Sequence, residues 1–218
     1  MTVPAGQGDA TEREDEAAAL ELEASVAVSE RQTLFTDAVV AIAITLLALD
    51  LPIPEGSTNH ELLRAAWDDH NEYIAYALSF VVIAAHWGAH HAAFKYVRTF
   101  GRLVGRLNLL WLFMMVTTPF ATRVISGDGA HGVRFGFYAL IQGLSSLILA
   151  LMVQRISAEG GFREGTDPGI PRRVRLRLLG TAGGFLISVP LFFVTTHAWV
   201  VWVGISFFNR IIPRFVKP

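Results

Sequence analysis

The chain has 218 residues, of which 52% are apolar and only 17% are charged, and its mean hydropathy is +0.43. Soluble proteins carry about a quarter charged residues, so this composition argues against a soluble domain and favours a protein embedded in a membrane. The absence of cysteine excludes a disulfide framework and thiolate metal sites.

Residues 1–28 form an acidic segment with runs of Ala and Glu. The segment lacks the basic leader and apolar core of a signal peptide, and a chain of this composition buries little apolar surface. We therefore expect a disordered acidic tail over residues 1–28, followed by one membrane domain over residues 29–218.

Six apolar segments follow, and a membrane-spanning helix needs about 20 predominantly apolar residues. The segments cover residues 35–51, 73–94, 107–125, 135–153, 178–194 and 198–212. The polar connection over 52–72 is expected to end in a short helix. The sixth segment is the shortest and follows the fifth almost directly, so five crossings or a re-entrant element remain open. The predicted fold is all-α, with six transmembrane helices.

The distribution of Lys and Arg predicts the orientation. If the N-terminus is cytoplasmic, 15 of the 18 basic residues lie on the cytoplasmic side, and only Arg64, Arg123 and Arg134 lie outside. The positive-inside rule therefore favours cytoplasmic N- and C-termini. The positive-inside orientation already explains the basic residues from Arg172 to Arg177, before the fifth segment, and contact with anionic lipid is an alternative role for them.

Within the first segment, Ile42, Leu46 and Leu49 fall on one helical stripe, which Phe35 extends towards the cytoplasm. Asp37 lies about 140° away from Ile42 on the same helical wheel. An aspartate inside a membrane helix is costly and needs a protein or water partner. The partners we expect are polar side chains of the second and third segments: Trp87, His90, His91 and Asn108.

The second segment places His86 and His90 at i, i+4, which is also the spacing of zinc ligands. No Asp or Glu lies in that run to act as ligand or base, so hydrogen bonding between helices is the preferred interpretation. The sequence contains no phosphate-binding glycine loop, no nucleophile elbow and no feature of nucleic-acid binding. We therefore expect neither an enzyme nor a cofactor. A membrane metal hydrolase remains an alternative built on the histidines.

The run Arg31-Gln-Thr-Leu-Phe35-Thr36-Asp37, followed by AVVAIAITLLALDL, resembles the Arg-x-x-x-Phe-Ser-Asp signature of the transmembrane-protein-175 (TMEM175) family of potassium channels. The resemblance continues with Trp87 three residues before the His90-His91 pair, with Asn108, and with the Thr-Pro-Phe run around Pro119. It covers the first three segments by motif and the last three by topology only. Thr36 stands where the family has Ser, and it keeps the hydroxyl.

The resemblance implies a plasma-membrane potassium channel without a carbonyl filter, built as a homotetramer of six-helix subunits around a pore lined by the first helix. Its partners would be potassium ions, present only transiently in the pore, and the bilayer. The residues carried over as pore lining and constriction are Ile42, Thr45, Leu46 and Leu49. Those carried over as the signature and inter-helix network are Arg31, Phe35, Thr36, Asp37, Trp87, His90, His91 and Asn108. The alternative is a secondary or proton-coupled transporter with a relay of Asp37, His86, His90 and His91.

Overall fold

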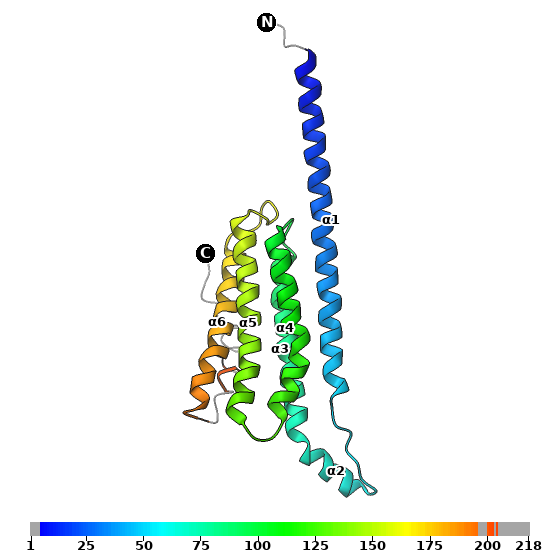
Figure 1. Ribbon diagram of the computed structural model, residues 1–218, viewed down its shortest axis with the longest axis vertical. Coiled ribbons are helices and arrows are strands. Elements are labelled where there is room, and N and C mark those ends of the chain that lie inside the picture. Colours follow the sequence, from blue (N-terminus) through cyan, green and yellow to red (C-terminus); the bar gives the residue numbers. More distant parts are fainter. Residues whose placement is uncertain (1–4, 196–199, 203, 205–218) are drawn as a thin grey trace.

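The computed structural model describes residues 5–195, 200–202 and 204. Within these residues the chain is built of helices joined by short connections (Figure 1). In chain order they are α1 (Ala5–Leu49), α2 (Asn59–Asp68), α3 (His70–Phe94), α4 (Arg102–Ser126), α5 (His131–Ala158) and α6 (Gly169–Phe192). The expected all-α fold class is thus confirmed.

Five of these helices are long and apolar enough to cross a membrane: α1 in its Glu12–Leu49 part, α3, α4, α5 and α6. The first five expected segments each fall on one of them. Most of the sixth segment, namely residues 198, 199, 203 and 205–212, lies outside the described residues. Six crossings therefore remain a prediction.

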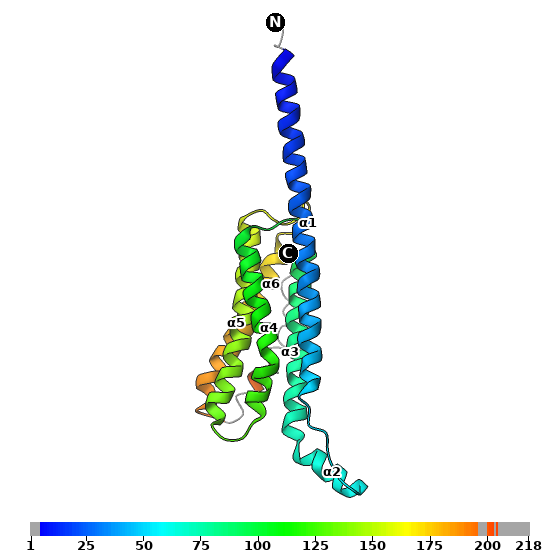
Figure 2. The same ribbon diagram turned by 45° about the vertical axis from the view of Figure 1, so that its right-hand side comes forward.

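The long helices run side by side, with α5 packed against both α4 and α6 and with α1 packed against α3 and α4 (Figures 1 and 2). The N-terminal half of α1 projects well beyond the other helices at one end, and α2 lies beyond them at the other (Figure 1). Because α1 contacts neither α5 nor α6 closely, a large part of its surface is left uncovered by its own chain.

The short helix α2 is the one expected in the connection over 52–72, and its start is fixed by a capping box. The Thr58 hydroxyl accepts a hydrogen bond from the Glu61 amide at 3.2 Å, and the Glu61 carboxylate accepts one from the Thr58 amide at 3.2 Å. Reciprocal bonds of this kind satisfy two amide groups that the first helical turn leaves unpaired.

The acidic segment, which we expected to be disordered, is helical from Ala5 and continues directly into the apolar part of α1. Ala and Glu are both strong helix formers, which accounts for this continuity. Residues 12–28 are almost entirely exposed, as expected for a solvated segment. The division into a tail and a membrane domain stays a prediction.

The connections at one end of the bundle are tied together. The Arg98 amide donates to the Gly161 carbonyl at 2.8 Å, and the Arg163 amide donates to the Tyr96 carbonyl at 2.8 Å. These bonds join the α3–α4 connection to the α5–α6 connection, so both lie at the same end of the bundle. That end is also the one beyond which the acidic part of α1 projects (Figure 1).

Candidate functional site

The membrane part of α1 has two distinct faces. One face is buried against α3 and α4 and is formed by Thr36, Val40, Ala43 and Leu47, which are at most 3% exposed. Their spacing of four, three and four residues follows one side of an α-helix. We call this the packed face of α1.

The residues expected to line a pore lie on the other face. Ile42 is 58% exposed, Leu46 37% and Leu49 78%, and Thr45 is exposed as well, with its hydroxyl donating to the Ile42 carbonyl at 2.8 Å. Phe35 is also on the exposed side of α1. These side chains form an apolar stripe that the described residues of the same chain do not cover, which we call the exposed stripe.

The packed face is held by a chain of buried hydrogen bonds across three helices. The Asn108 amide nitrogen on α4 donates to the Thr36 hydroxyl on α1 at 2.7 Å, and the Asn108 carbonyl oxygen lies 3.2 Å from Nε2 of His90 on α3. Because an amide oxygen only accepts, the His90 ring N–H is the donor. His90 also stacks between Phe94 and Trp111, with ring centroids 4.0 and 4.9 Å away. The structure therefore brings together three of the signature residues: Thr36, His90 and Asn108.

Asp37 receives a hydrogen bond from the Trp87 indole on α3 at 2.9 Å, which is one of the partners expected for it. The carboxylate is only partly buried, and Trp87 is 41% exposed, so this pair lies at the rim of the α1–α3 contact. The His91 ring lies 5.5 Å from the Trp87 ring. Arg31 is exposed on α1.

A second buried polar cluster joins α3, α4 and α5, and the sequence analysis missed it. The Thr122 hydroxyl donates to the Ser79 hydroxyl at 2.7 Å, and Ser79 lies 3.1 Å from the Tyr138 hydroxyl. One turn away, the Gln142 amide donates to the Thr118 hydroxyl at 3.3 Å. The available signal was the i, i+4 spacing of Thr118 and Thr122, and of Tyr138 and Gln142, within apolar segments.

One ion pair at the α2 end of the bundle was also missed. Asp50, directly after α1, lies 3.2 Å from the guanidinium of Arg123 near the end of α4. Opposite charges 73 residues apart carry no local pattern, so sequence spacing could not have found this pair. It joins the end of the exposed stripe to α4.

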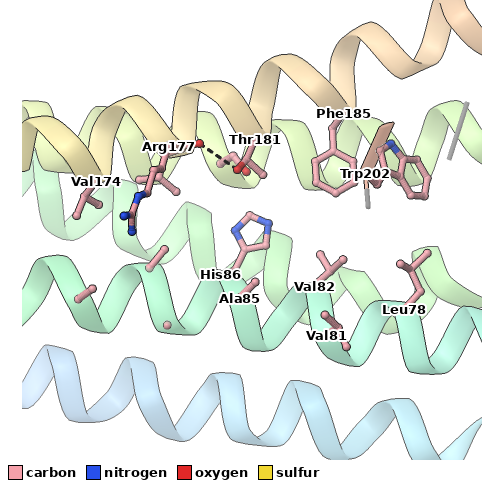
Figure 3. Close-up of a pocket in the computed structure, with 15 residues that line it drawn as sticks. Leu78, Val81, Val82, Ala85, His86, Val174, Arg177, Thr181, Phe185 and Trp202 are labelled. Carbon is pink, nitrogen blue, oxygen red and sulfur yellow. Dashed lines mark hydrogen bonds between the residues drawn. The ribbon is translucent and has the colours of Figure 1, made fainter. Parts of the chain in front are cut away.

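The histidines do not form one cluster. His90 belongs to the network with Asn108, whereas His86 lies against a cavity between α3 and α6 (Figure 3). Among the described residues, no three His, Cys, Asp or Glu side chains lie close enough to hold a metal ion. The geometry thus offers no support for the metal-hydrolase alternative.

A model of a known protein family matches the first part of the chain. The family model described as "Endosomal/lysosomal potassium channel TMEM175" matches residues 31–119, which include the apolar part of α1, all of α2 and α3, and α4 up to Pro119. The crystal structure of a lysosomal potassium-selective channel TMEM175 homolog from Chamaesiphon minutus has the same fold, with a TM-score of 0.70 at 22% identity over 85% of this chain and 96% of that one.

Relatives match over most of the chain. A protein from Streptomyces collinus named as a potassium channel is 32% identical over 172 residues, which is 77% of this chain and 84% of that protein. A Chryseobacterium protein named as a potassium channel is 26% identical, over 78% of this chain and 92% of that protein. The Gallus gallus protein named as an endosomal/lysosomal proton channel TMEM175 is 38% identical, over 44% of this chain and 21% of that much longer protein. The extent and identity of the Streptomyces match, together with the family model, show that this chain belongs to the TMEM175 family.

Proposed function

We propose that this chain is the subunit of a homotetrameric, potassium-permeable channel of the plasma membrane, with α1 lining the central pore. The observation that carries the proposal is the two-sided character of α1. Its packed face is buried against α3 and α4, while Ile42, Leu46 and Leu49 stay exposed on the other side. The two bacterial relatives named as potassium channels, which this chain matches over 84% and 92% of their length, support the choice of ion.

Selectivity in this channel comes from partial dehydration. In a four-fold assembly each residue of the exposed stripe appears four times around the axis, so Ile42, Leu46 and Leu49 form a stack of apolar rings about 10 Å long. Apolar rings offer no oxygen atoms to replace the water around an ion, and such constrictions also gate by dewetting. Potassium holds its water less tightly than sodium, so it crosses at lower cost.

The subunit contributes six crossings and keeps both termini in the cytoplasm. Five helices among the described residues are long and apolar enough to cross the membrane. In this proposal the sixth expected segment, 198–212, is the crossing that returns the chain to the cytoplasm. The basic residues after it, Arg214 and Lys217, then lie on the cytoplasmic side, as the positive-inside rule favours.

The test is planar-bilayer recording of the purified protein in potassium and sodium gradients, on wild type and Ile42→Asn. Ile42 is β-branched and stiff at χ1, which makes it our choice for the tightest ring. Asparagine at this position should wet the constriction, raise the unitary conductance and weaken discrimination against sodium, because ions keep more of their water. The matched control is Ile187→Asn, since Ile187 is similarly exposed at 65% but lies on α6, whose described residues do not contact α1.

The control should conduct like wild type. A functional Ile42→Asn channel with unchanged conductance and potassium-to-sodium ratio would remove α1 from the narrow part of the pore. Flux that saturates without unitary steps would instead support the carrier alternative, in which Asp37 and the histidines relay protons.

Proton conduction should be measured separately in the same recordings, because the Gallus gallus relative is named as a proton channel. With potassium equal on both sides and a pH gradient imposed, a potassium channel reverses near zero voltage. A reversal potential that follows the proton gradient would assign proton conduction to this chain in place of potassium.

A further inference from the structure

A long cavity of about 480 Å³ lies between α3 and α6, on the side of α3 away from α1 (Figure 3). Its walls are mostly apolar, from Leu78 to Ala92 on α3 and from Val174 to Phe185 on α6, with Trp202 at one end. Cavities of roughly 300–1,000 Å³ with apolar walls and a few convergent polar groups are typical ligand sites.

Three residues that line this cavity each have a buried polar atom without a hydrogen-bond partner within the described part of the chain: Nε2 of His86, Oγ of Ser146 and Nε of Arg177. His86 is only 4% exposed and Ser146 is fully buried. Figure 3 shows Arg177 extending from α6 and His86 extending from α3 into the same space. Buried polar groups normally have a hydrogen-bond partner, because leaving one without a partner is costly, so this set points to an occupant with a polar group of its own.

The charge of the site indicates which polar group fits. Arg177 is a permanent cation, and no Asp or Glu is among the described residues that line the cavity. Asp167, the acidic residue nearest to Arg177 in the sequence, pairs with Arg173 at 2.9 Å. None of the residues outside the described ranges is Asp or Glu, so the C-terminal residues 205–218 offer no acidic side chain to Arg177.

The position of Arg177 matches the head of a lipid. It is the last of the basic residues that open α6, and the apolar part of the helix begins with the next residue, Leu178. Basic pockets between transmembrane helices on the cytoplasmic side bind anionic head groups. The apolar walls beyond Arg177 then run alongside the hydrocarbon layer.

We propose that the cleft between α3 and α6 binds an anionic phospholipid, with its phosphate at Arg177, His86 and Ser146 and an acyl chain along the apolar walls towards Trp202. The Arg177 guanidinium and the His86 ring N–H donate to the phosphate oxygens, and Ser146 adds a hydroxyl donor. The lipid thereby joins α6 to α3, two helices that contact each other less than α6 contacts α5.

The test is native mass spectrometry of the detergent-solubilised full chain titrated with phosphatidylglycerol, and with phosphatidylcholine of the same acyl chains. Wild type should retain one phosphatidylglycerol per subunit in preference to phosphatidylcholine. Arg177→Gln should weaken that binding about tenfold, the loss expected for one charge-assisted hydrogen bond. Arg177→Lys should retain most of it, because it keeps the cation.

Two further variants distinguish specific lipid binding in the cleft from nonspecific attraction of the lipid to surface charge. Arg172→Gln removes the same charge from an exposed position on α6 and should leave binding unchanged. Ala85→Phe keeps every charge but narrows the cleft beside His86, so it should also weaken binding. Equal retention by wild type, Arg177→Gln and Ala85→Phe would overturn the proposal and indicate that the chain's own residues close the cleft. Equal losses in Arg172→Gln and Arg177→Gln would overturn it too, because they would indicate nonspecific attraction.

Discussion

At the scale of single residues, Asn108 connects three helices through one side-chain amide. It donates to Thr36 on α1 and accepts from His90 on α3, and all three side chains are at most 1% exposed. The bond to Thr36 also shows that threonine can serve where the family signature has serine, since the hydroxyl keeps its partner and the extra methyl is fully packed.

Replacing Asn108 with Ala should destabilise the protein, because it leaves the Thr36 hydroxyl without its donor and the His90 N–H without its acceptor. Each unmet buried group costs about 1–3 kcal/mol, although hydrogen bonds between membrane helices average nearer 0.6 kcal/mol. Thermal unfolding of the detergent-solubilised protein should therefore shift clearly to lower temperature. Asn71→Ala is the control, since Asn71 is exposed at the start of α3 and should cause no shift.

Asp37 and Trp87 should act as a pair in assembly and not in ion selection. Asp37→Ala removes the acceptor of the Trp87 indole N–H, and Trp87→Phe removes the donor. Each single variant should lower the yield of assembled protein on size-exclusion chromatography, and the double variant should lose less than the two single losses combined. A fully assembled Asp37→Ala channel with altered ion preference would place Asp37 in the conduit instead.

At the scale of the elements, the apolar pattern identified the membrane helices but not their full lengths. The expected segments 107–125 and 135–153 lie inside α4, Arg102–Ser126, and α5, His131–Ala158. The difference arises because hydropathy detects only the part of a helix that fits the hydrocarbon layer. Backbone hydrogen bonding continues past it through Arg, Gly and Gln residues that carry no apolar signal.

The faces of α1 could be predicted only in part, for a different reason. In a membrane helix both sides are apolar, so Val40 and Leu47 have the same hydropathy signal as Ile42 and Leu49, although the first two are buried and the last two exposed. The hydrogen bond between Thr36 and Asn108 distinguishes the packed face, but these two residues lie 72 positions apart in the chain, so no local pattern reveals it. Only the packing of α1 on α3 and α4 resolves which face is covered.

This asymmetry predicts opposite effects for two leucines two residues apart. Leu47→Ala removes a side chain that is 3% exposed, and large-to-small changes at such sites cost about 2–5 kcal/mol. Leu49→Ala removes one that is 78% exposed, so it should leave thermal stability nearly unchanged while altering conductance in bilayer recordings. A marked loss of stability from Leu49→Ala, without a change in conductance, would mean that the stripe packs against another protein surface and does not line a pore.

At the scale of the whole molecule, the distribution of charge and the arrangement of the helices agree with each other. The two connections tied by the Arg98–Gly161 and Arg163–Tyr96 bonds lie at one end of the bundle. Those connections and their borders carry most of the basic residues, including Lys95, Arg102 and Arg172. The opposite end holds α2 and the Asp50–Arg123 pair. Such a separation is what the positive-inside rule requires of a protein with one fixed orientation.

The orientation can be tested by epitope tags in intact cells. A tag inserted over residues 55–60, in the connection before and at the start of α2, should be reached by antibody without permeabilisation, because this connection lies opposite the basic end. Tags before Met1 and after Pro218 should be reached only after permeabilisation, since an even number of crossings returns the chain to its starting side. Five membrane-length helices alone would leave the end of the chain outside, so the tag after Pro218 directly tests whether residues 198–212 cross the membrane. An externally accessible tag at that end, with the other two tags as expected, would show that the subunit has five crossings and would remove the sixth from the proposed architecture.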